Sequence, residues 1–246
     1  MSDYFTKKKH KSGNPVIYRV IDKAISEYSM LQKGDRILLA VSGGKDSTVM
    51  AEYFASRKMR RGSDFEVKAF HVQSGISPVF PDELKSKFDE WNMELITKEI
   101  DVLGRLKAGK KMNCWFCSVQ RRLELSKMAV SLGCNKIALG HHLDDILETL
   151  IMNMLNKKAV FTMPPVLRFD KFPITIIRPL CLCDIPMISR HAEREGYLST
   201  TCTCSYQENS SRKDARARLK GLLGESYRLK RNMFLSLHHI NHDYLP

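Results

Sequence analysis

The sequence lacks an apolar run of the roughly 18 residues that a membrane-spanning helix requires. Its first residues, MSDYFTKKKHKSG, also lack the apolar core of a secretory signal peptide. We therefore expect a cytoplasmic protein with no membrane partner. No cysteine precedes Cys114, and the total of seven is odd. In a reducing compartment such a set favours metal binding or catalysis over a framework of disulfides.

Acidic residues are also in short supply, because 27 of them stand against 40 basic residues and leave the 246-residue chain at +13. The excess is confined to three segments. Residues 1–23 carry a net charge of +4, residues 104–128 carry +6 and residues 205–246 carry +4, whereas the rest of the chain sums to −1. Positive charge concentrated on a neutral body favours binding of a polyanion such as RNA. Three solvated basic faces without a partner are the alternative interpretation.

Short apolar runs alternate with amphipathic segments along most of the chain. We predict strands at residues 36–41, 65–72, 94–100, 136–139 and 173–178. We predict helices at residues 15–28, 46–58, 82–91, 115–132, 145–155 and 185–195. This alternation predicts an α/β fold, with a doubly wound, mostly parallel sheet of about five strands and helices on both faces. Residues 157–173 show no periodicity, and we expect a long surface loop there.

Changes in composition divide the chain into three expected parts. We expect residues 1–33 to form a basic N-terminal arm and helix, and residues 34–200 to form the α/β domain. Within that domain, residues 110–122 carry a Cys-x-x-Cys segment. Residues 201–246 are a cysteine-bearing basic tail, and the pattern over residues 210–238 predicts one or two helices in it.

A glycine-rich loop, Ser42-Gly-Gly-Lys-Asp-Ser47, joins the first predicted strand to a helix. Its glycines allow the backbone to approach an anion, and the helix N-terminus offers unpaired N–H groups to a phosphate. It is not a Walker A loop, because Leu39 stands where that motif needs glycine and Asp46 follows Lys45. Asp46 beside a phosphate requires a bridging cation such as Mg²⁺. A strand-to-helix turn without a ligand is the alternative.

Strand–SGGKDS–helix resembles the motif of the PP-loop ATPases, or N-type ATP pyrophosphatases, which adenylate a substrate. A second block, residues 138–149 (ALGHHLDDILET), resembles the G-H-x-x-D-D-x-x-E-T segment of the tRNA-modifying branch of that family. The resemblance implies that Asp144 and Asp145 hold Mg²⁺ or orient the base. An aspartate pair that caps the helix N-terminus is the alternative. The resemblance implies nucleotide contacts from Ser42, Gly43, Gly44, Lys45, Asp46, Ser47, His71, Gly140 and His141.

Two cysteine pairs complete the pattern. Cys114-Trp-Phe-Cys117 begins a predicted helix inside the most basic segment, a position that favours the thiolate form that ligates metal or attacks sulfur. Cys202-Thr-Cys204 lies far downstream. A redox pair in the first motif is one alternative, and a structural zinc site made by all four thiolates is another.

With residues 31–36 (LQKGDR), Arg121-Arg122 and residues 177–180 (IRPL), the chain is similar to the TtcA-type tRNA 2-thiocytidine synthetases from about residue 10 to 240. The resemblance implies a [4Fe–4S] cluster held by Cys114, Cys117 and one downstream cysteine, with the fourth iron open to carry sulfur. The family usually has Cys-x-x-Cys downstream, whereas Cys-x-Cys stands here. We therefore assign Cys202 as the third ligand, with Cys204 as the alternative.

The implied reaction is ATP-dependent thiolation at C2 of an anticodon-loop cytidine through an adenylated base. Lys45 and Arg121 would stabilise developing negative charge, and Asp46, Asp144 and Asp145 complete the implied catalytic set. The basic segments would bind the anticodon stem-loop. A cysteine desulfurase or sulfide would supply the sulfur, and a homodimer is left open.

Three other functions fit parts of the pattern. A tRNA 2-thiouridine synthetase would use the same parts, although no cysteine before Cys114 supplies the zinc ribbon of those relatives. A lysidine-type adenylating enzyme with a structural zinc is the second alternative. The third belongs to another class, a non-catalytic RNA-binding module on a degenerate ATPase fold.

Overall fold

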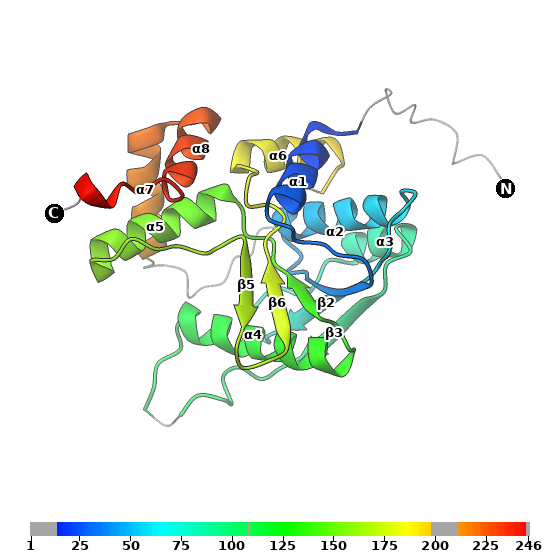
Figure 1. Cartoon of the computed structure of the whole chain (residues 1–246). Coiled ribbons are helices and arrows are strands. Elements are labelled where there is room, and N and C mark those ends of the chain that lie inside the picture. Colours follow the sequence, from blue (N-terminus) through cyan, green and yellow to red (C-terminus); the bar gives the residue numbers. More distant parts are fainter. Residues whose placement is uncertain (1–13, 108, 198–210, 245–246) are drawn as a thin grey trace.

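The computed structural model describes residues 14–107, 109–197 and 211–244 (Figure 1). The helices are α1 (Val16–Glu27), α2 (Lys45–Lys58), α3 (Asp82–Glu90), α4 (Cys114–Ser131), α5 (Leu143–Lys157), α6 (Ile185–Arg194), α7 (Ser211–Leu223) and α8 (Tyr227–Ser236). The strands are β1 (Asp35–Ala40), β2 (Phe65–Gln73), β3 (Leu95–Glu99), β4 (Lys136–Ala138), β5 (Val166–Phe169) and β6 (Ile174–Ile177). These confirm the predicted elements to within a few residues. No helix in the described ranges is both long and apolar enough to cross a membrane.

The strands form one sheet in the order β3-β2-β1-β4-β6-β5. All neighbours are parallel except β5 and β6. In register, Ile37 of β1 lies between Val67 of β2 and Lys136 of β4. The chain moves outward from β1 to β3 and then returns to β4, so the direction of winding reverses between β1 and β4. In open α/β sheets ligands bind at such a switch point, beyond the carboxyl ends of the strands.

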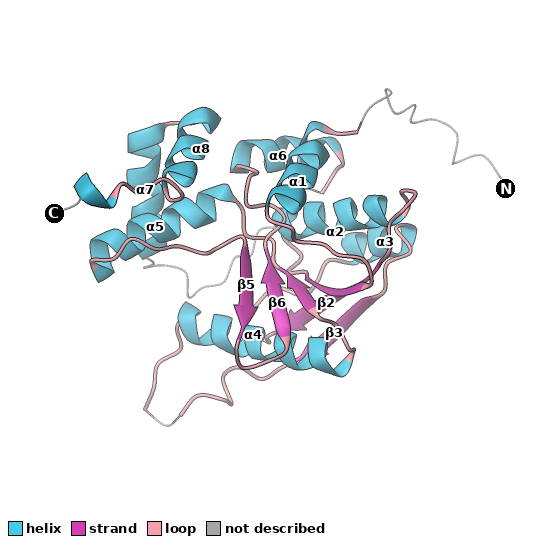
Figure 2. Ribbon diagram, viewed as in Figure 1, coloured by secondary structure: helices cyan, strands magenta, loops and turns pink. Residues whose placement is uncertain are grey.

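Alternating side chains of the strands build two hydrophobic cores, one on each face of the sheet. Ile37 and Leu39 of β1 point into the larger core, to which α1, α2, α3, α5, α6 and α8 contribute. Leu38 points the other way and packs with Leu125 and Ala129 of α4. Figure 2 shows α4 lying apart from the cluster of α1, α2 and α6. The predicted doubly wound α/β class is confirmed.

One predicted feature is wrong, because the stretch 157–173 contains a strand rather than only a loop. Strand β5 pairs antiparallel with β6, with Leu167 opposite Ile176. The rings of Phe169 and Phe172 stack with centroids 5.9 Å apart at the turn between the two strands. The four residues of β5 include Arg168, which interrupts their apolar run. The sheet therefore has six strands rather than five.

The C-terminal helices α7 and α8 pack on α5. Ala215 and Leu219 of α7 and Phe234 of α8 are buried. The predicted pair of basic helices is thus joined to the helix that begins at the GHHLDD motif. This contact puts the tail close to the second predicted motif.

Candidate functional site

The glycine-rich loop follows β1 and turns tightly into α2. Gly43 has φ +82°, a left-handed conformation that L side chains rarely adopt. A Cβ atom there would also lie 3.3 Å from Cδ of Pro81, so the backbone passes directly over that ring. Gly44 caps α2 without any side-chain hydrogen bond to the cap. The backbone N–H groups of the first turn are therefore arranged as an anion site requires.

Side chains of the loop hold its shape and carry charge. The Ser42 backbone N–H donates to Oγ of Ser47 over 3.1 Å, and that hydroxyl donates to the carbonyl oxygen of Gly44 over 3.0 Å. Lys45 Nζ and Asp46 Oδ1 lie 2.7 Å apart, with about a quarter to a third of each side chain exposed. Ser47 thus closes the turn, whereas Lys45 and Asp46 carry opposite charges beside the helix N-terminus.

The two sequence motifs meet at the switch point. A Cβ atom on Gly140 would lie 3.2 Å from the backbone nitrogen of Ser47 and 3.3 Å from its Cα. The loop after β4 therefore contacts the glycine-rich loop, backbone against backbone. A larger residue at position 140 would force the two loops apart, which explains the glycine in physical terms.

Helix α5 begins at Leu143, two residues earlier than predicted, because His142 and Asp145 form a capping box. The Asp145 backbone N–H donates to His142 Nδ1 over 3.3 Å, and the His142 N–H donates to Asp145 Oδ2 over 3.2 Å. Burial alone would raise the pKa of Asp145, but the neighbouring His142, His141 and Arg212 hold it below its usual value. The predicted capping role therefore holds for Asp145, and the carboxylate stays ionised.

Two groups at this edge, half-buried His141 and buried Arg178, have shifted pKa values. Burial lowers the pKa of His141 to about 4, so its imidazole is neutral near pH 7. Arg178 Nε donates to His141 Nδ1 over 3.3 Å, and burial lowers the pKa of Arg178 to about 10. Arg178 follows β6 inside the IRPL segment. It was not among the predicted site residues, although its place directly after a strand was a usable signal.

His71 is buried at the carboxyl half of β2. Its Nδ1 donates to the carbonyl oxygen of Val41 over 2.8 Å, and its Nε2 lies 3.1 Å from Oε1 of Gln73. Burial lowers its pKa, and Arg121 of α4 lowers it further. His71 thus braces the residue before the glycine-rich loop, while its predicted contact with a nucleotide stays a prediction.

Asp144 and Glu148 face the C-terminal helices. Asp144 accepts a hydrogen bond from the backbone N–H of Ile185 over 2.8 Å, and its other oxygen lies 2.8 Å from Nζ of Lys230. Glu148 is fully buried and pairs with Arg216 at 2.6 Å. The sequence interpretation missed Lys230 and Arg216, because it assigned the basic tail to RNA. Arginines at positions 212 and 216, facing acids at positions 145 and 148, form a complementary spacing on two helices that was a usable signal.

Cys114 and Cys117 occupy the first turn of α4. Cys114 is exposed and Cys117 half-buried, and Asn113 caps the helix by accepting from the Phe116 N–H over 2.9 Å. The positive end of the helix dipole favours thiolates here. Cys202 and Cys204 lie outside the described residues.

The other three cysteines belong to the two cores. Cys134, Cys181 and Cys183 are buried, and burial raises all three pKa values, that of Cys181 to about 12. They stay protonated and are poor metal ligands.

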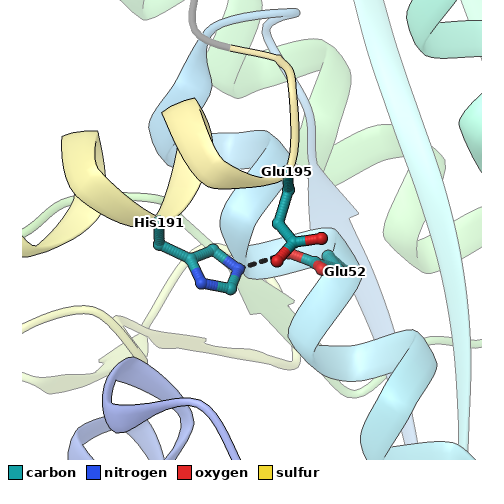
Figure 3. Close-up of side chains that lie close together, drawn as sticks. All are labelled: Glu52, His191 and Glu195. Carbon is teal, nitrogen blue, oxygen red and sulfur yellow. Dashed lines mark hydrogen bonds and ion pairs between the residues drawn. The ribbon is translucent and has the colours of Figure 1, made fainter. Parts of the chain in front are cut away.

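Among the described residues, one group has the composition of a metal site away from these motifs (Figure 3). It consists of Glu52 on α2, His191 on α6 and Glu195 directly after α6. His191 Nε2 and Glu52 Oε2 are 2.7 Å apart, which is a hydrogen bond. Tyr197 also donates to Glu52, and Arg194 pairs with Glu195 at 3.0 Å. Protein groups thus satisfy the cluster, which joins α2 to α6.

Comparison with known proteins gives consistent matches. A family profile described as a PP-loop domain matches residues 15–219. The tRNA-cytidine(32) 2-sulfurtransferase of Anaeromyxobacter dehalogenans (strain 2CP-C) is 35% identical over 91% of this chain and 79% of its own length. The protein of the same description from Nitrosospira multiformis is 34% identical over 92% of this chain and 78% of its own length.

Two solved structures resemble the fold. The U34-tRNA thiolase NcsA from Methanococcus maripaludis, solved with its [4Fe-4S] cluster, has a TM-score of 0.70 and 25% identity, covering 92% of this chain and 78% of that chain. The NMN synthetase from Francisella tularensis has a TM-score of 0.55 and 14% identity, covering 95% of this chain and 98% of that chain. The second likeness concerns the fold alone.

Proposed function

The chain belongs to the PP-loop family and, within it, to the tRNA-cytidine(32) 2-sulfurtransferases, and we propose that it converts an anticodon-loop cytidine to 2-thiocytidine at the expense of ATP. It is therefore an enzyme of tRNA thiolation. The observation that carries the proposal is the direct packing of the Gly140 loop on the Ser47 turn at the switch point of the sheet. Because its substrate is tRNA, the proposal places the protein in the cytoplasm.

The nucleotide site is proposed from charge and backbone geometry. The triphosphate lies on the first turn of α2 and takes Lys45 away from Asp46, its partner at 2.7 Å. Asp46 and Asp145 are then the carboxylates that would hold Mg²⁺, which neutralises phosphate charge. Asp144 is less suited to that role, because Lys230 and the Ile185 N–H already occupy its oxygens. The remaining predicted contacts, from Ser42, Gly43, Gly44, Ser47, His71, Gly140 and His141, are kept in the proposal.

The proposed chemistry has two steps. First, O2 of the cytidine attacks the α-phosphorus of ATP, which forms an O–P bond and releases pyrophosphate. Second, a sulfur nucleophile attacks C2, the C2–O bond breaks, and the oxygen departs with AMP. Lys45 and Arg121 stabilise the negative charge that develops on phosphate. Neutral His141 can accept or donate a hydrogen bond without adding a charge.

Among the described residues, the two thiols of the Cys-x-x-Cys motif are suitable ligands for an iron–sulfur cluster. Cys114 and Cys117 are one helical turn apart, partly exposed and at a helix N-terminus, which suits two thiolate ligands. We propose that Cys202, or else Cys204, is the third ligand of a [4Fe–4S] cluster. When bound, the cluster would hold the sulfur that is transferred. A cysteine desulfurase or sulfide would supply that sulfur.

The tRNA surface is proposed beside these cysteines. Lys107, Lys110 and Lys111 are exposed, and within the described ranges none of them pairs with a carboxylate. Phosphate contacts from such lysines position a nucleic acid without reading its sequence. We therefore propose that the anticodon stem-loop lies across this segment. The proposal is compatible with a homodimer.

Anaerobic purification tests the proposal. Iron and acid-labile sulfide are measured first, and the protein is then incubated with ATP, tRNA and sulfide. We expect iron to be present, AMP to form only with tRNA, and 2-thiocytidine to be detected by mass spectrometry of the digested tRNA. Stoichiometric zinc without iron, together with unmodified tRNA, would contradict it. Detection of 2-thiouridine would instead favour the closely related activity.

A further inference from the structure

The C-terminal helices meet the GHHLDD helix through ion pairs as well as through apolar packing. Glu148 of α5 is fully buried, and Nε of Arg216 approaches one of its oxygens to 2.6 Å. Arg212 lies 3.7 Å from the other oxygen and 3.6 Å from Asp145. Glu148 holds the pKa of Arg216 above its usual value, so the guanidinium stays charged. Two arginines of α7 therefore neutralise two acids on one face of α5.

Lys230 of α8 makes a second junction one turn away. Its side chain is 5% exposed, and Nζ lies 2.8 Å from Asp144 and 3.5 Å from Asp184. Asp144 lies in the first turn of α5 and Asp184 caps α6, so the ammonium joins the N-terminal ends of two helices. A buried lysine with two carboxylate partners is a specific arrangement, because an unpaired buried charge is costly.

A series of contacts joins these ion pairs to the glycine-rich loop. Asp145 caps α5 by bonding to His142, and the preceding Gly140 touches the backbone of Ser47. Gly140 thus lies three residues before the start of α5 and contacts the glycine-rich loop. Lys230 and Arg212 of the tail pair with Asp144 and Asp145 in the first turn of the same helix.

We infer that Arg216 and Lys230 are positioning residues of the nucleotide site, so that α7 and α8 form part of the ATP-binding unit. Neither residue is a predicted nucleotide contact. They act through Glu148 and Asp144, which set where Asp145 and Gly140 stand beside Ser47. The inference rests on the proposed function, because it takes ATP as the nucleotide.

A matched pair of arginines on α7 tests it. Arg216 faces buried Glu148, whereas Arg218 pairs at 2.9 Å with Asp214 of its own helix and both side chains are well exposed. ATP affinity is measured by isothermal titration calorimetry on full-length R216A, R216K, R218A and unmodified protein, without tRNA. We expect R216A to weaken ATP binding about tenfold, R216K to restore most of that loss, and R218A to leave the affinity unchanged.

Thermal unfolding of the same samples separates positioning from general stability. The inference holds when R216A is still folded at the temperature of the titration but binds ATP more weakly than R216K and R218A. It is overturned when R216A binds ATP as tightly as R218A, and also when R216K restores neither affinity nor midpoint. If the unmodified protein binds no ATP, the proposed function itself fails. If only R216A loses ATP affinity, the proposed function still stands.

Discussion

The loop and helix around Cys114 and the C-terminal pair α7–α8 are both basic, yet they direct their cations differently. Around Cys114, Lys107, Lys110 and Lys111 are exposed to solvent. In α7 and α8, Arg216 and Lys230 point inward to buried carboxylates. Positive charge thus marks an open surface at Lys107, Lys110 and Lys111 and a packed junction at Arg216 and Lys230. A net charge counted along the sequence cannot separate the two, because the answer depends on where the acids lie.

The largest expected effect comes from removing an inward cation. Lys230→Met keeps the length of the side chain but leaves Asp144 buried without its ammonium partner. We expect the free energy of unfolding to fall by about 3–5 kcal/mol, the usual cost of breaking a buried pair from one side. Urea denaturation followed by circular dichroism measures it. Lys220→Met is the control, because Lys220 and Glu225 form a solvent-exposed pair at 3.6 Å and should contribute less than about 1 kcal/mol. If the two variants lost equal free energy of unfolding, buried and exposed cations would not differ in their contribution to stability.

The second prediction concerns the outward region and its thiols. Cys114→Ser should lower tRNA thiolation by at least about 100-fold, or roughly 2.7 kcal/mol, because a hydroxyl does not replace a thiolate ligand. ATP affinity without tRNA should stay unchanged. The measurements are thiolated nucleoside per tRNA, iron content and calorimetric ATP binding. Cys134→Ala serves as the control, since Cys134 is a buried core residue and its loss should leave the iron content intact. Full thiolation by the Cys114→Ser variant would show that the reaction does not need the Cys114 thiolate.

A third prediction uses pH and concerns His141, which lies just before α5, the helix on which α7 and α8 pack. Burial lowers the pKa of His141 to about 4, against 6.5 in an unfolded chain. Between these values the unfolded chain binds more protons, so the free energy of unfolding falls as the pH falls. The contribution is complete above pH 6.5 and is lost below pH 4. We expect it to be on the order of 2–3 kcal/mol.

Denaturation series from pH 7 to pH 4 measure this contribution. His141→Asn cannot titrate, so its stability should fall less steeply over that window. His239→Asn changes an exposed histidine and should follow the unmodified protein. A His141→Asn curve parallel to that of the unmodified protein would show that His141 does not titrate as the structure requires.

Local chemistry was sufficient to predict much of the fold. The helices were recognisable from the spacing of their apolar residues, and five of the strands from short apolar runs. The glycine-rich loop was recognisable because Gly43 needs a backbone conformation that few residues adopt. Strand β5 was not recognisable from the sequence, since its four residues form a strand only by pairing with β6.

The ion pairs of the tail escaped prediction for the same reason. Lys230 and Asp144 are 86 positions apart, and no local pattern indicates that α8 lies over the start of α5. The sequence analysis treated Asp144 and Asp145 as one pair with a shared role. The structure separates them, because Asp145 caps its own helix while Asp144 turns to the tail. Neighbours in the chain point in different directions on a helix, so a shared motif does not imply a shared contact.

The smallest expected effect returns to the outward lysines. Each phosphate contact lowers the logarithm of affinity by about 0.9 per unit of log salt concentration for a duplex and somewhat less for single strands. The double variant Lys110→Ala, Lys111→Ala should therefore reduce the salt slope of tRNA binding by about 1.5 and weaken binding several-fold at moderate salt. Filter binding at increasing salt concentrations measures both quantities. Lys220→Ala on α7 is the control and should keep the slope, because its ammonium is already paired with Glu225. If both variants lost slope equally, the tail would share the RNA surface, and the contrast between the two basic regions would hold only for their buried cations.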